Sequence, residues 1–263
     1  MQHSALLNVM IAAARKAART LKRDFGEVEN LQVSLKGPGN FVTAADRKAE
    51  ETLKAELAKA RPGYGFLGEE SGRHAGTDTT HTWIVDPLDG TTNFLHGIPQ
   101  FAISIGLERS GTIVAGVIYN PITDELFVAE RGKGAFLNDK RLRVAARKRL
   151  ADSVIACGLP HLGRGDLDLG LRELRAIQDK VAGLRRFGAA ALDMAFVAAG
   201  RLDGYWERNI SPWDIAAGII ILREAGGFVT DIDGADAMFT KKHVVAGNET
   251  IQRELQRLLK AAG

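Results

Sequence analysis

The sequence predicts a mixed α and β fold in which the two halves follow different patterns, α+β first and α/β second. In residues 1–145, two helical segments precede a set of strand-like segments, and Ser110-Gly111 between two of these is a hairpin signal. In residues 146–263, strands and helices alternate, which is typical of layered α/β structure. Because no linker-like stretch separates the halves, we expect one compact unit.

The first half is expected to begin with two helices and to continue as an antiparallel sheet. Apolar residues at helical spacing predict a helix over 4–25. A second helix is predicted over 44–60, with Thr43 as its N-cap and Pro62-Gly63 as its stop. Apolar runs between turn residues predict strands at 82–86, 101–109, 112–119 and 125–129.

The second half is expected to alternate between strands and helices. Gly226-Gly227 is a typical helix stop and ends the helix that begins at Pro212. Helical spacing predicts helices at 167–181, 189–199 and 212–225, followed by a terminal helix. Short apolar runs predict strands at 153–157, 203–207, 228–231 and 244–246.

Composition places the chain among ordinary globular proteins. Its 263 residues are 45% hydrophobic and 25% charged, which excludes a disordered or fibrous protein. Cys157 is the sole cysteine, so an intrachain disulfide and a cysteine-based metal site are both excluded. The net charge of +3 suits an anionic substrate, although the basic residues are scattered and nucleic-acid binding stays a minor alternative.

No segment predicts a membrane span or a secretory signal. Apolar runs stay below the roughly 20 residues that a bilayer requires. The apolar stretch 5–14 is followed rather than preceded by basic residues, which is the wrong order for a secretory signal. Together with the single cysteine, this pattern predicts a cytoplasmic protein with no membrane partner.

The strongest chemical signal is the string Asp-Pro-Leu-Asp-Gly-Thr. An apolar strand ends at Asp86, Pro87 is expected to stop its ladder, and Asp89 follows. Two carboxylates at a strand end can hold a hard cation through oxygen. Gly90 and Thr91 can offer N–H and hydroxyl groups to a phosphate. A plain turn is the alternative, since Pro, Asp and Gly are turn residues.

Three further acids could complete a cation site, and each has an ordinary alternative. Glu69 lies in Gly-Glu-Glu-Ser, which taken alone is typical of a solvated loop. Asp214 follows Ser211 by three residues and Asp46 follows Thr43 in the same way, so both can be simple helix caps. A pair of Mg²⁺ ions needs more carboxylates than Asp-Pro-Leu-Asp supplies, which favours their participation.

A small-residue helix start offers a place for an anion. Gly188 opens an Ala-rich segment, so free N–H groups could receive an anion there, with Arg185 adding charge. Simple packing of an Ala-rich helix explains the segment equally well. Asp231-Ile-Asp233 has the form of a phosphoaspartate nucleophile without the usual context, so attack by a metal-bound water is the favoured route.

Taken together, these segments resemble the inositol monophosphatase family. Residues 86–91 and Trp-Asp-Ile-Ala-Ala-Gly at 213–218 match its two signatures, and 68–71 and 42–46 match two further motifs in the family's order. The likeness runs over most of the chain. It is greatest to bacterial members, including the extragenic-suppressor type, which share Arg-Arg-x-Gly-x-Ala-Ala-Leu-Asp.

The resemblance implies a layered αβαβα sandwich, the inositol monophosphatase / fructose-1,6-bisphosphatase-like (sugar phosphatase) fold. It further implies a lithium-sensitive homodimer with two or three Mg²⁺ ions. The implied metal ligands are Glu69, Asp86, the Leu88 carbonyl, Asp89 and Asp214. The implied catalytic residues, which orient the attacking water, are Asp46, Glu69 and Thr91. The implied substrate contacts are Glu69, Leu88, Asp89, Gly90, Thr91, Arg185, Gly188, Ala189, Ala190, Glu207 and Asp214.

The implied activity is that of a phosphoric monoester hydrolase acting on a small phosphorylated polyol or sugar, above all inositol 1-monophosphate. Many animal members have a His shortly before the second signature, where this chain has Ile210-Ser211-Pro212, so inositol selectivity is open. One alternative is a phosphatase for fructose 1,6-bisphosphate, 3′-phosphoadenosine nucleotides or histidinol phosphate. Another is a regulatory protein that binds RNA polymerase, antitermination factors or RNA. A third is a Mg²⁺-binding scaffold without turnover.

Overall fold

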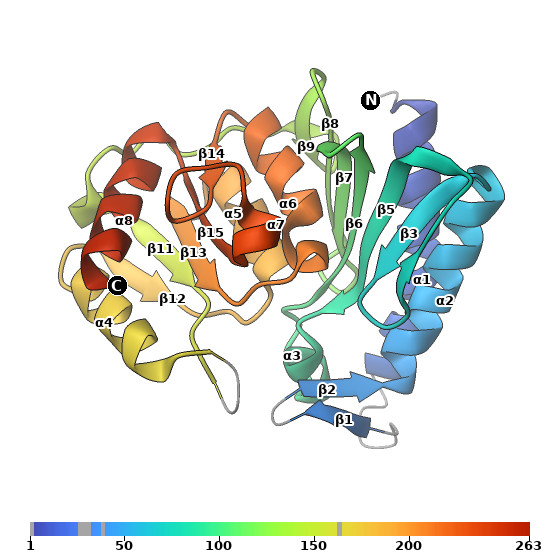
Figure 1. The fold of residues 1–263 in the computed structure, drawn as a ribbon, viewed down its shortest axis with the longest axis horizontal. Coiled ribbons are helices and arrows are strands. Elements are labelled where there is room, and N and C mark those ends of the chain that lie inside the picture. Colours follow the sequence, from blue (N-terminus) through green and yellow to red (C-terminus); the bar gives the residue numbers. More distant parts are fainter. Residues whose placement is uncertain (1–2, 26–32, 38–39, 162–164) are drawn as a thin grey trace.

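The computed structural model describes residues 3–25, 33–37, 40–161 and 165–263. The first half contains α1 (Ala5–Phe25), β1 (Val33–Gly37), β2 (Asn40–Thr43), α2 (Ala44–Ala60), β3 (Tyr64–Gly68), β4 (Gly72–His74), β5 (Asp78–Asp89), α3 (Thr91–Leu95), β6 (Ala102–Arg109), β7 (Thr112–Asn120), β8 (Glu125–Glu130), β9 (Gly134–Leu137) and β10 (Lys140–Arg141). The second half contains η2 (Leu150–Asp152), β11 (Val154–Cys157), α4 (Leu167–Gln178), β12 (Gly183–Arg185), α5 (Ala190–Ala198), β13 (Gly204–Arg208), α6 (Pro212–Glu224), β14 (Phe228–Thr230), α7 (Met238–Lys241), β15 (His243–Gly247) and α8 (Glu249–Ala262). Helices and sheets alternate in five layers, so the predicted αβαβα sandwich is confirmed (Figure 1).

An eight-stranded sheet forms the second layer, and α1 and α2 pack on its outer face (Figure 1). Its strand order is β10-β9-β8-β7-β6-β5-β3-β4, and every neighbouring pair is antiparallel except β3 and β5. Buried residues of α1 recur at helical spacing, among them Met10, Ala14, Ala17 and Leu21, which explains why this segment is helical. They share one core cluster with apolar side chains of the sheet. The predicted antiparallel sheet is confirmed, with a parallel pair added at β3.

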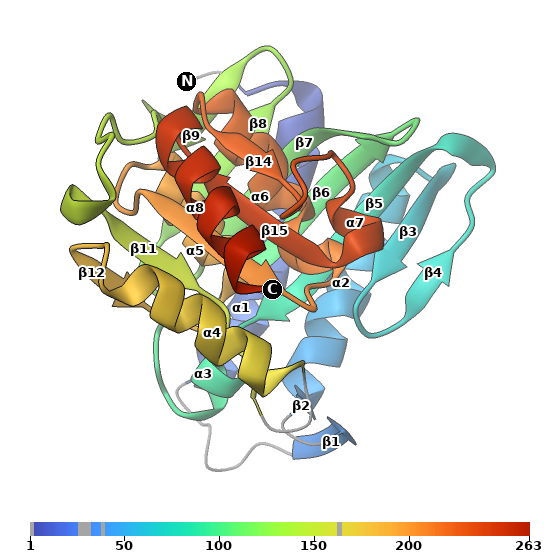
Figure 2. The ribbon, with the colours of Figure 1, turned by 60° about the vertical axis from the view of Figure 1, so that its left-hand side comes forward.

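A five-stranded mixed sheet forms the fourth layer. Its order is β12-β11-β13-β15-β14, in which β11 runs parallel to both neighbours and β15 runs antiparallel to both of its own. Figure 2 shows α4 and α8 lying across the outer face of this sheet. The apolar stripe of α8, which includes Ile251, Leu255 and Leu259, packs with Trp206 of β13 in a separate core cluster.

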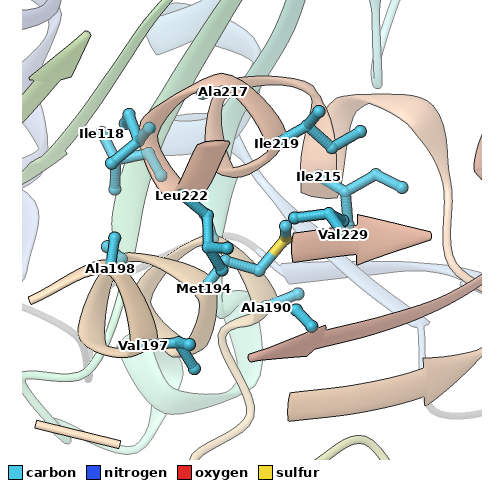
Figure 3. Packing of buried hydrophobic residues seen from close by; sticks show 14 of the residues in the cluster. Ile118, Ala190, Met194, Val197, Ala198, Ile215, Ala217, Ile219, Leu222 and Val229 are labelled. Atoms are coloured by element: carbon cyan, nitrogen blue, oxygen red, sulfur yellow. The ribbon is translucent and has the colours of Figure 1, made fainter. Parts of the chain in front are cut away.

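α5 and α6 form the middle layer and are buried between the two sheets. Every residue of α6 from Ile215 to Leu222 is buried, as expected for a helix that is apolar on all sides. Figure 3 shows side chains of both helices packed with Ile118 of β7 and Val229 of β14, which come from the two different sheets. The middle helices therefore join the halves through one continuous core.

Two glycines let α6 lie close against the first sheet. Gly106 on β6 and Gly116 on β7 are direct partners in the ladder. A Cβ added at Gly106 would lie 2.7 Å from the Cβ of Ala216, and a Cβ added at Gly116 would lie 2.8 Å from the carbonyl oxygen of Ala217. A side chain at either position would push α6 away from the sheet, and α6 carries Asp214 in its first turn.

Several local features differ from the predictions. Pro87 does not end its strand: β5 continues to Asp89, and the pairing with β6 shifts register between Asp86 and Asp89. An irregular step in the ladder accommodates a residue that has no N–H to donate.

The helix predicted over 167–181 ends at Gln178, and β12 follows it. The side chain of Thr43 lies outside the described residues, so its N-cap role stays a prediction.

The structure also bears on membranes and on cysteine chemistry. Within the described residues, no helix is both long and apolar enough to cross a membrane. Cys157, the sole cysteine, is 2% exposed at the end of β11.

Candidate active site

A pocket of about 700 Å³ lies at the junction of the two halves. Its wall is built from the ends of β3 and β5, from α3, from the segment after β11, from the start of α5, from β13 and from the start of α6. The predicted site residues that line it are Glu69, Asp86, Leu88, Asp89, Gly90, Thr91, Gly188, Ala190, Glu207 and Asp214. Residues from both family signatures therefore share one cavity.

Three predicted residues are not part of the pocket wall. Asp46 lies behind it on α2, 1% exposed, and its Oδ1 accepts a 3.1 Å hydrogen bond from Thr91 Oγ1. Ala189 is the buried residue directly before α5. Arg185 is exposed, and its Nη1 donates to a neighbouring backbone carbonyl at 2.8 Å. Arg186, the next residue, does line the pocket.

The end of β5 is shaped by hydrogen bonds within its own segment. Asp86 is 2% exposed, and its Oδ1 accepts from the backbone N–H of Leu88 at 2.8 Å. The Leu88 carbonyl oxygen is an acceptor for Thr91 Oγ1 at 3.1 Å. Gly90 has a φ of 95°, and a Cβ there would lie 2.8 Å from the carbonyl oxygen of Gln100, so glycine is required. The plain-turn alternative holds only at Gly90, between the end of β5 and the start of α3, whereas Asp86 and Asp89 belong to β5, and both carboxylates lie on the pocket wall.

Asp214 serves as a helix cap and also lines the pocket. It lies in the first turn of α6, and its Oδ2 accepts from the backbone N–H of Ser211 at 2.8 Å. That bond is half of the predicted capping box. Because one oxygen is used at the helix start, the carboxylate is held in a fixed direction while it faces the pocket.

Asp89 ties the first half of the chain to the start of α5. Its Oδ2 accepts from the backbone N–H of Ala191 at 2.7 Å. Nearby, Asn93 Nδ2 donates to the carbonyl oxygens of Phe187 at 2.8 Å and Gln100 at 2.7 Å, which holds the turn before α5 against α3. Gly188, with a φ of 80°, completes that turn and lines the pocket. The predicted anion-receiving helix start is therefore part of the cavity.

Negative charge accumulates on the pocket wall. Burial, and then the charges of Glu69 and Asp89, raise the pKa of Asp86 well above its usual range. Burial, and then the charge of Asp214, do the same to the pKa of Asp89. Burial and the charge of Glu69 raise the pKa of Asp214 to about 7. The charge of Asp214 also contributes to the raised pKa of Asp86.

The donor set fits a hard divalent cation in its chemistry. Its members are carboxylates and one backbone carbonyl, the oxygen ligands that Mg²⁺ and Ca²⁺ prefer, with no thiolate among them. A cation there would relieve the repulsion that raises the pKa values of these acids. In the part of the chain that the structure describes, however, no three Asp, Glu, His or Cys side chains are close enough together to form a complete metal site. Metal ligation by these residues therefore stays a prediction.

A second acidic group lies on the part of the wall formed by the second half. Glu207 on β13 accepts a hydrogen bond from the hydroxyl of Tyr205. A Cβ at Gly158 would collide with the Glu207 carboxylate, so the glycine leaves the space that the Glu207 side chain occupies. Asp193 on α5 is 2% exposed, and burial, followed by the charge of Glu207, raises its pKa well above the usual range.

Sequence reasoning missed several residues of the pocket wall. The prediction named Arg185 instead of its neighbour Arg186. The two differ in where their side chains point: Arg186 lines the pocket, whereas Arg185 donates to a neighbouring backbone carbonyl. Asp193 follows Ala190 by three residues on α5, so helical spacing from the predicted anion site was a usable signal. Asn93 gave no local signal, because its role is a contact with a segment about 90 residues later.

Comparison with known proteins extends the likeness to the whole chain. The model of the inositol monophosphatase family matches residues 2–262. A protein of Mesorhizobium japonicum named inositol-1-monophosphatase is 65% identical over 260 residues, covering 99% of this chain and 98% of that protein. A protein of Pseudomonas aeruginosa named Nus factor SuhB is 42% identical over 247 residues, covering 92% of this chain and 91% of that protein.

A solved structure shows that the likeness includes the fold. The crystal structure of extragenic suppressor protein suhB from Bartonella henselae has 63% sequence identity and a TM-score of 0.95. It covers 98% of this chain and 99% of its own. The similarity therefore spans both halves and the pocket between them.

Proposed function

The chain belongs to the inositol monophosphatase family of phosphatases, and we propose that it hydrolyses inositol 1-monophosphate to inositol and phosphate with Mg²⁺ as cofactor. The observation that carries this proposal is the pocket itself, which joins the acids of both family signatures with a helix start suited to an anion. The relatives named inositol-1-monophosphatase support inositol 1-monophosphate over other phosphate esters.

The acids at the ends of β3 and β5 and at the start of α6 are the proposed cation ligands. Bound there, Mg²⁺ would neutralise the phosphate oxygens and lower the pKa of a coordinated water. Two or three ions are expected, and Li⁺ is expected to inhibit. The residues proposed to hold them are Glu69, Asp86, the Leu88 carbonyl, Asp89 and Asp214.

Thr91 and Asp46 are proposed to orient the attacking water, together with Glu69. The Thr91 hydroxyl has a single proton and two acceptors at 3.1 Å, Asp46 Oδ1 and the Leu88 carbonyl oxygen. Its lone pairs therefore remain able to accept a hydrogen bond from a water. Because Asp46 is buried behind Thr91, it is proposed to act through the Thr91 hydroxyl, together with the Leu88 carbonyl.

The helix start at Gly188, Ala189 and Ala190 is proposed to receive the phosphate, together with Gly90 and Thr91. Glu207 is proposed to accept hydrogen bonds from hydroxyls of the alcohol portion. For the cationic contact we favour Arg186 over the predicted Arg185, because Arg186 already lines the pocket. A homodimer and a cytoplasmic location complete the proposal.

A regulatory role is the second candidate. It is motivated by the relative named Nus factor SuhB, whose name implies a part in transcription. A pull-down with RNA polymerase and antitermination factors tests it directly. The two roles are compatible, because the acids of the pocket are present in either case.

Phosphate release over a substrate panel tests the enzymatic proposal. The panel contains inositol 1-monophosphate, fructose 1,6-bisphosphate, a 3′-phosphoadenosine nucleotide and histidinol phosphate, each with Mg²⁺ and with a chelator. We expect the highest kcat/KM on inositol 1-monophosphate, complete loss with chelator and recovery on adding Mg²⁺. Turnover that persists without metal would overturn the cofactor, and a clear preference for another ester would overturn the substrate.

A further inference from the structure

Helix α2 presents two buried acids one turn apart toward the pocket loops. Asp46 is 1% exposed and Glu50 is 3% exposed. Residues four apart lie on the same side of a helix. Asp46 reaches Thr91 in the segment after β5, whereas Glu50 reaches the turn after β3, which carries Glu69. α2 thus contacts both loops that supply acids from the first half.

Glu50 uses both of its carboxylate oxygens on consecutive backbone N–H groups. Oε2 accepts from Glu70 N at 2.8 Å, and Oε1 accepts from Ser71 N at 2.7 Å. Both donors directly follow Glu69. Hydrogen bonds to an ionised acceptor are about twice as strong as neutral ones, so this carboxylate fixes the backbone of the turn firmly.

The same carboxylate also lies close to the residue before Glu69. A Cβ added at Gly68 would lie 2.5 Å from Glu50 Oε2 and 2.6 Å from its Cδ. The carboxylate therefore packs directly against the Gly68 backbone. The backbone N–H of Glu69 itself donates to the Val85 carbonyl oxygen at 3.2 Å. Glu69 thus lies between Gly68, which packs against the Glu50 carboxylate, and two residues that donate to it, and its own N–H is bonded to β5.

We propose that Glu50 is a positioning residue that sets the direction of Glu69 toward the other acids of the pocket. This inference rests on the proposed function, because it assigns Glu50 an effect on cation binding. Burying a carboxylate costs free energy because the group loses its hydration. For Glu50, the two hydrogen bonds from the turn after β3 offset that cost. Holding the backbone on either side of Glu69 restricts where its carboxylate can lie relative to Asp86 and Asp214.

Glu50→Gln is the first test, with Glu51→Gln as the matched control on the exposed face of α2. Glutamine keeps the shape of the side chain, but its NH₂ group meets an N–H donor and so loses one of the two bonds. We measure Mn²⁺ binding by calorimetry without substrate, and the Mg²⁺ concentration that gives half-maximal phosphate release. Both should weaken by roughly tenfold or more in Glu50→Gln. Neither should change in Glu51→Gln.

Two further variants separate positioning from a purely structural role. Gly68→Ala displaces the carboxylate from the opposite side, so it should weaken Mn²⁺ binding as well; it also carries the test should Glu50→Gln not fold. In a Glu69→Gln background, Glu50→Gln should cause no additional loss of Mn²⁺ affinity, because its effect passes through Glu69. An additive loss would overturn the inference.

The failure of this inference is distinguishable from the failure of the proposed function. Should Glu50→Gln fold and bind Mn²⁺ as tightly as the unmodified chain, Glu50 is structural only and the inference is wrong, whatever the thermal stability. Should the unmodified chain neither bind Mn²⁺ nor release phosphate, the proposed function itself is wrong.

Discussion

The two halves of the chain supply the pocket by different structural means. The first half delivers Asp86 and Asp89 from the end of strand β5, and Glu69 directly after β3. The second half delivers Asp214 and Ala190 from the first turns of α6 and α5. A strand end is fixed by its neighbours in the ladder, whereas a helix start has free backbone N–H groups. The first half therefore contributes its acids from strand ends. The second half contributes Asp214 and the predicted anion-receiving groups from helix starts, beside Glu207 on β13 and Asp193 on α5.

The halves are nevertheless coupled at two points. Asp89 accepts a hydrogen bond from Ala191, and so joins the end of β5 to the start of α5. Gly106 and Gly116 let α6 pack closely on the first sheet, and this sets the depth of Asp214. Variants on each side of these contacts test what each half contributes to the pocket and how strongly the halves depend on each other.

The largest effect is expected for Asp89→Asn. The remaining oxygen can still accept from Ala191 N, so the fold should be kept, but an NH₂ group replaces an oxygen that a cation could bind. We expect kcat for every substrate of the panel to fall by roughly 100-fold or more. Asp152→Asn, at an exposed position outside the pocket wall, is the control and should leave kcat unchanged. Near-normal turnover in Asp89→Asn would remove this acid from the cation site.

Glu207→Gln should weaken recognition of the alcohol portion of the substrate more than recognition of the phosphate. Glutamine can still accept from the Tyr205 hydroxyl, so the change is mainly the loss of charge. We expect kcat/KM on inositol 1-monophosphate to fall by roughly tenfold or more, the usual worth of a hydrogen bond to a charged group. p-Nitrophenyl phosphate has no hydroxyl for Glu207 to bind, so its kcat/KM should change much less. Equal losses on both substrates would contradict the proposed division.

Gly106→Ala should weaken the contact between the halves. The added Cβ would lie 2.7 Å from the Cβ of Ala216, so α6 must shift or the sheet must bend. We expect the free energy of unfolding to fall by about 1–3 kcal/mol in a urea titration. Ala216→Gly removes the clashing atom. The double variant should therefore lose less unfolding free energy than the two single variants lose together. Full additivity would show that α6 does not depend on this glycine for its position.

The smallest effect concerns the thiol of Cys157, which lines the second half of the pocket. Burial, and then the charges of Asp193 and Glu207, raise its pKa to about 12. A raised pKa keeps the thiol neutral and unreactive, with about 10⁻⁴ of it ionised at pH 8. Iodoacetamide should therefore label the native chain very slowly and the urea-unfolded chain fully, as measured by mass spectrometry. Glu207→Gln should speed the labelling of the folded chain; an unchanged rate would separate Glu207 from the thiol's environment.

The long elements were predictable from the sequence because their burial repeats with a fixed period. α1, with buried residues from Leu7 to Leu21 at helical spacing, is the clearest example. β3 and β12 were not predicted, since a few residues carry too little periodicity to be recognised. Pro87 was misjudged for a different reason: a local rule about proline was overridden by an irregular pairing in a long strand.

The site was predictable where its residues belong to short motifs, and less so where it depends on contacts across the chain. The string Asp-Pro-Leu-Asp-Gly-Thr at 86–91 and the first turn of α6 can be recognised locally, from the spacing of their acids, glycine and capping residues. Glu50 gave no such signal, because a glutamate in a charged helix is usually solvated and its burial arises only when the turn after β3 packs on α2. Whether Arg185 or Arg186 faces the pocket depends on β12, which was itself not predicted.

The crowded carboxylates of the pocket make the lifetime of the folded chain depend on its ionic surroundings. Unfolding separates these acids and releases their repulsion, so the cation-free protein is easier to open than its large core alone implies. A cation that binds only the folded chain stabilises it by about 2.7 kcal/mol at one hundred times its dissociation constant. Should Mg²⁺ be that cation, as proposed above, a shortage of magnesium would expose the chain to proteolysis as well as inactivate it, and the abundance of the protein would follow the supply of the ion.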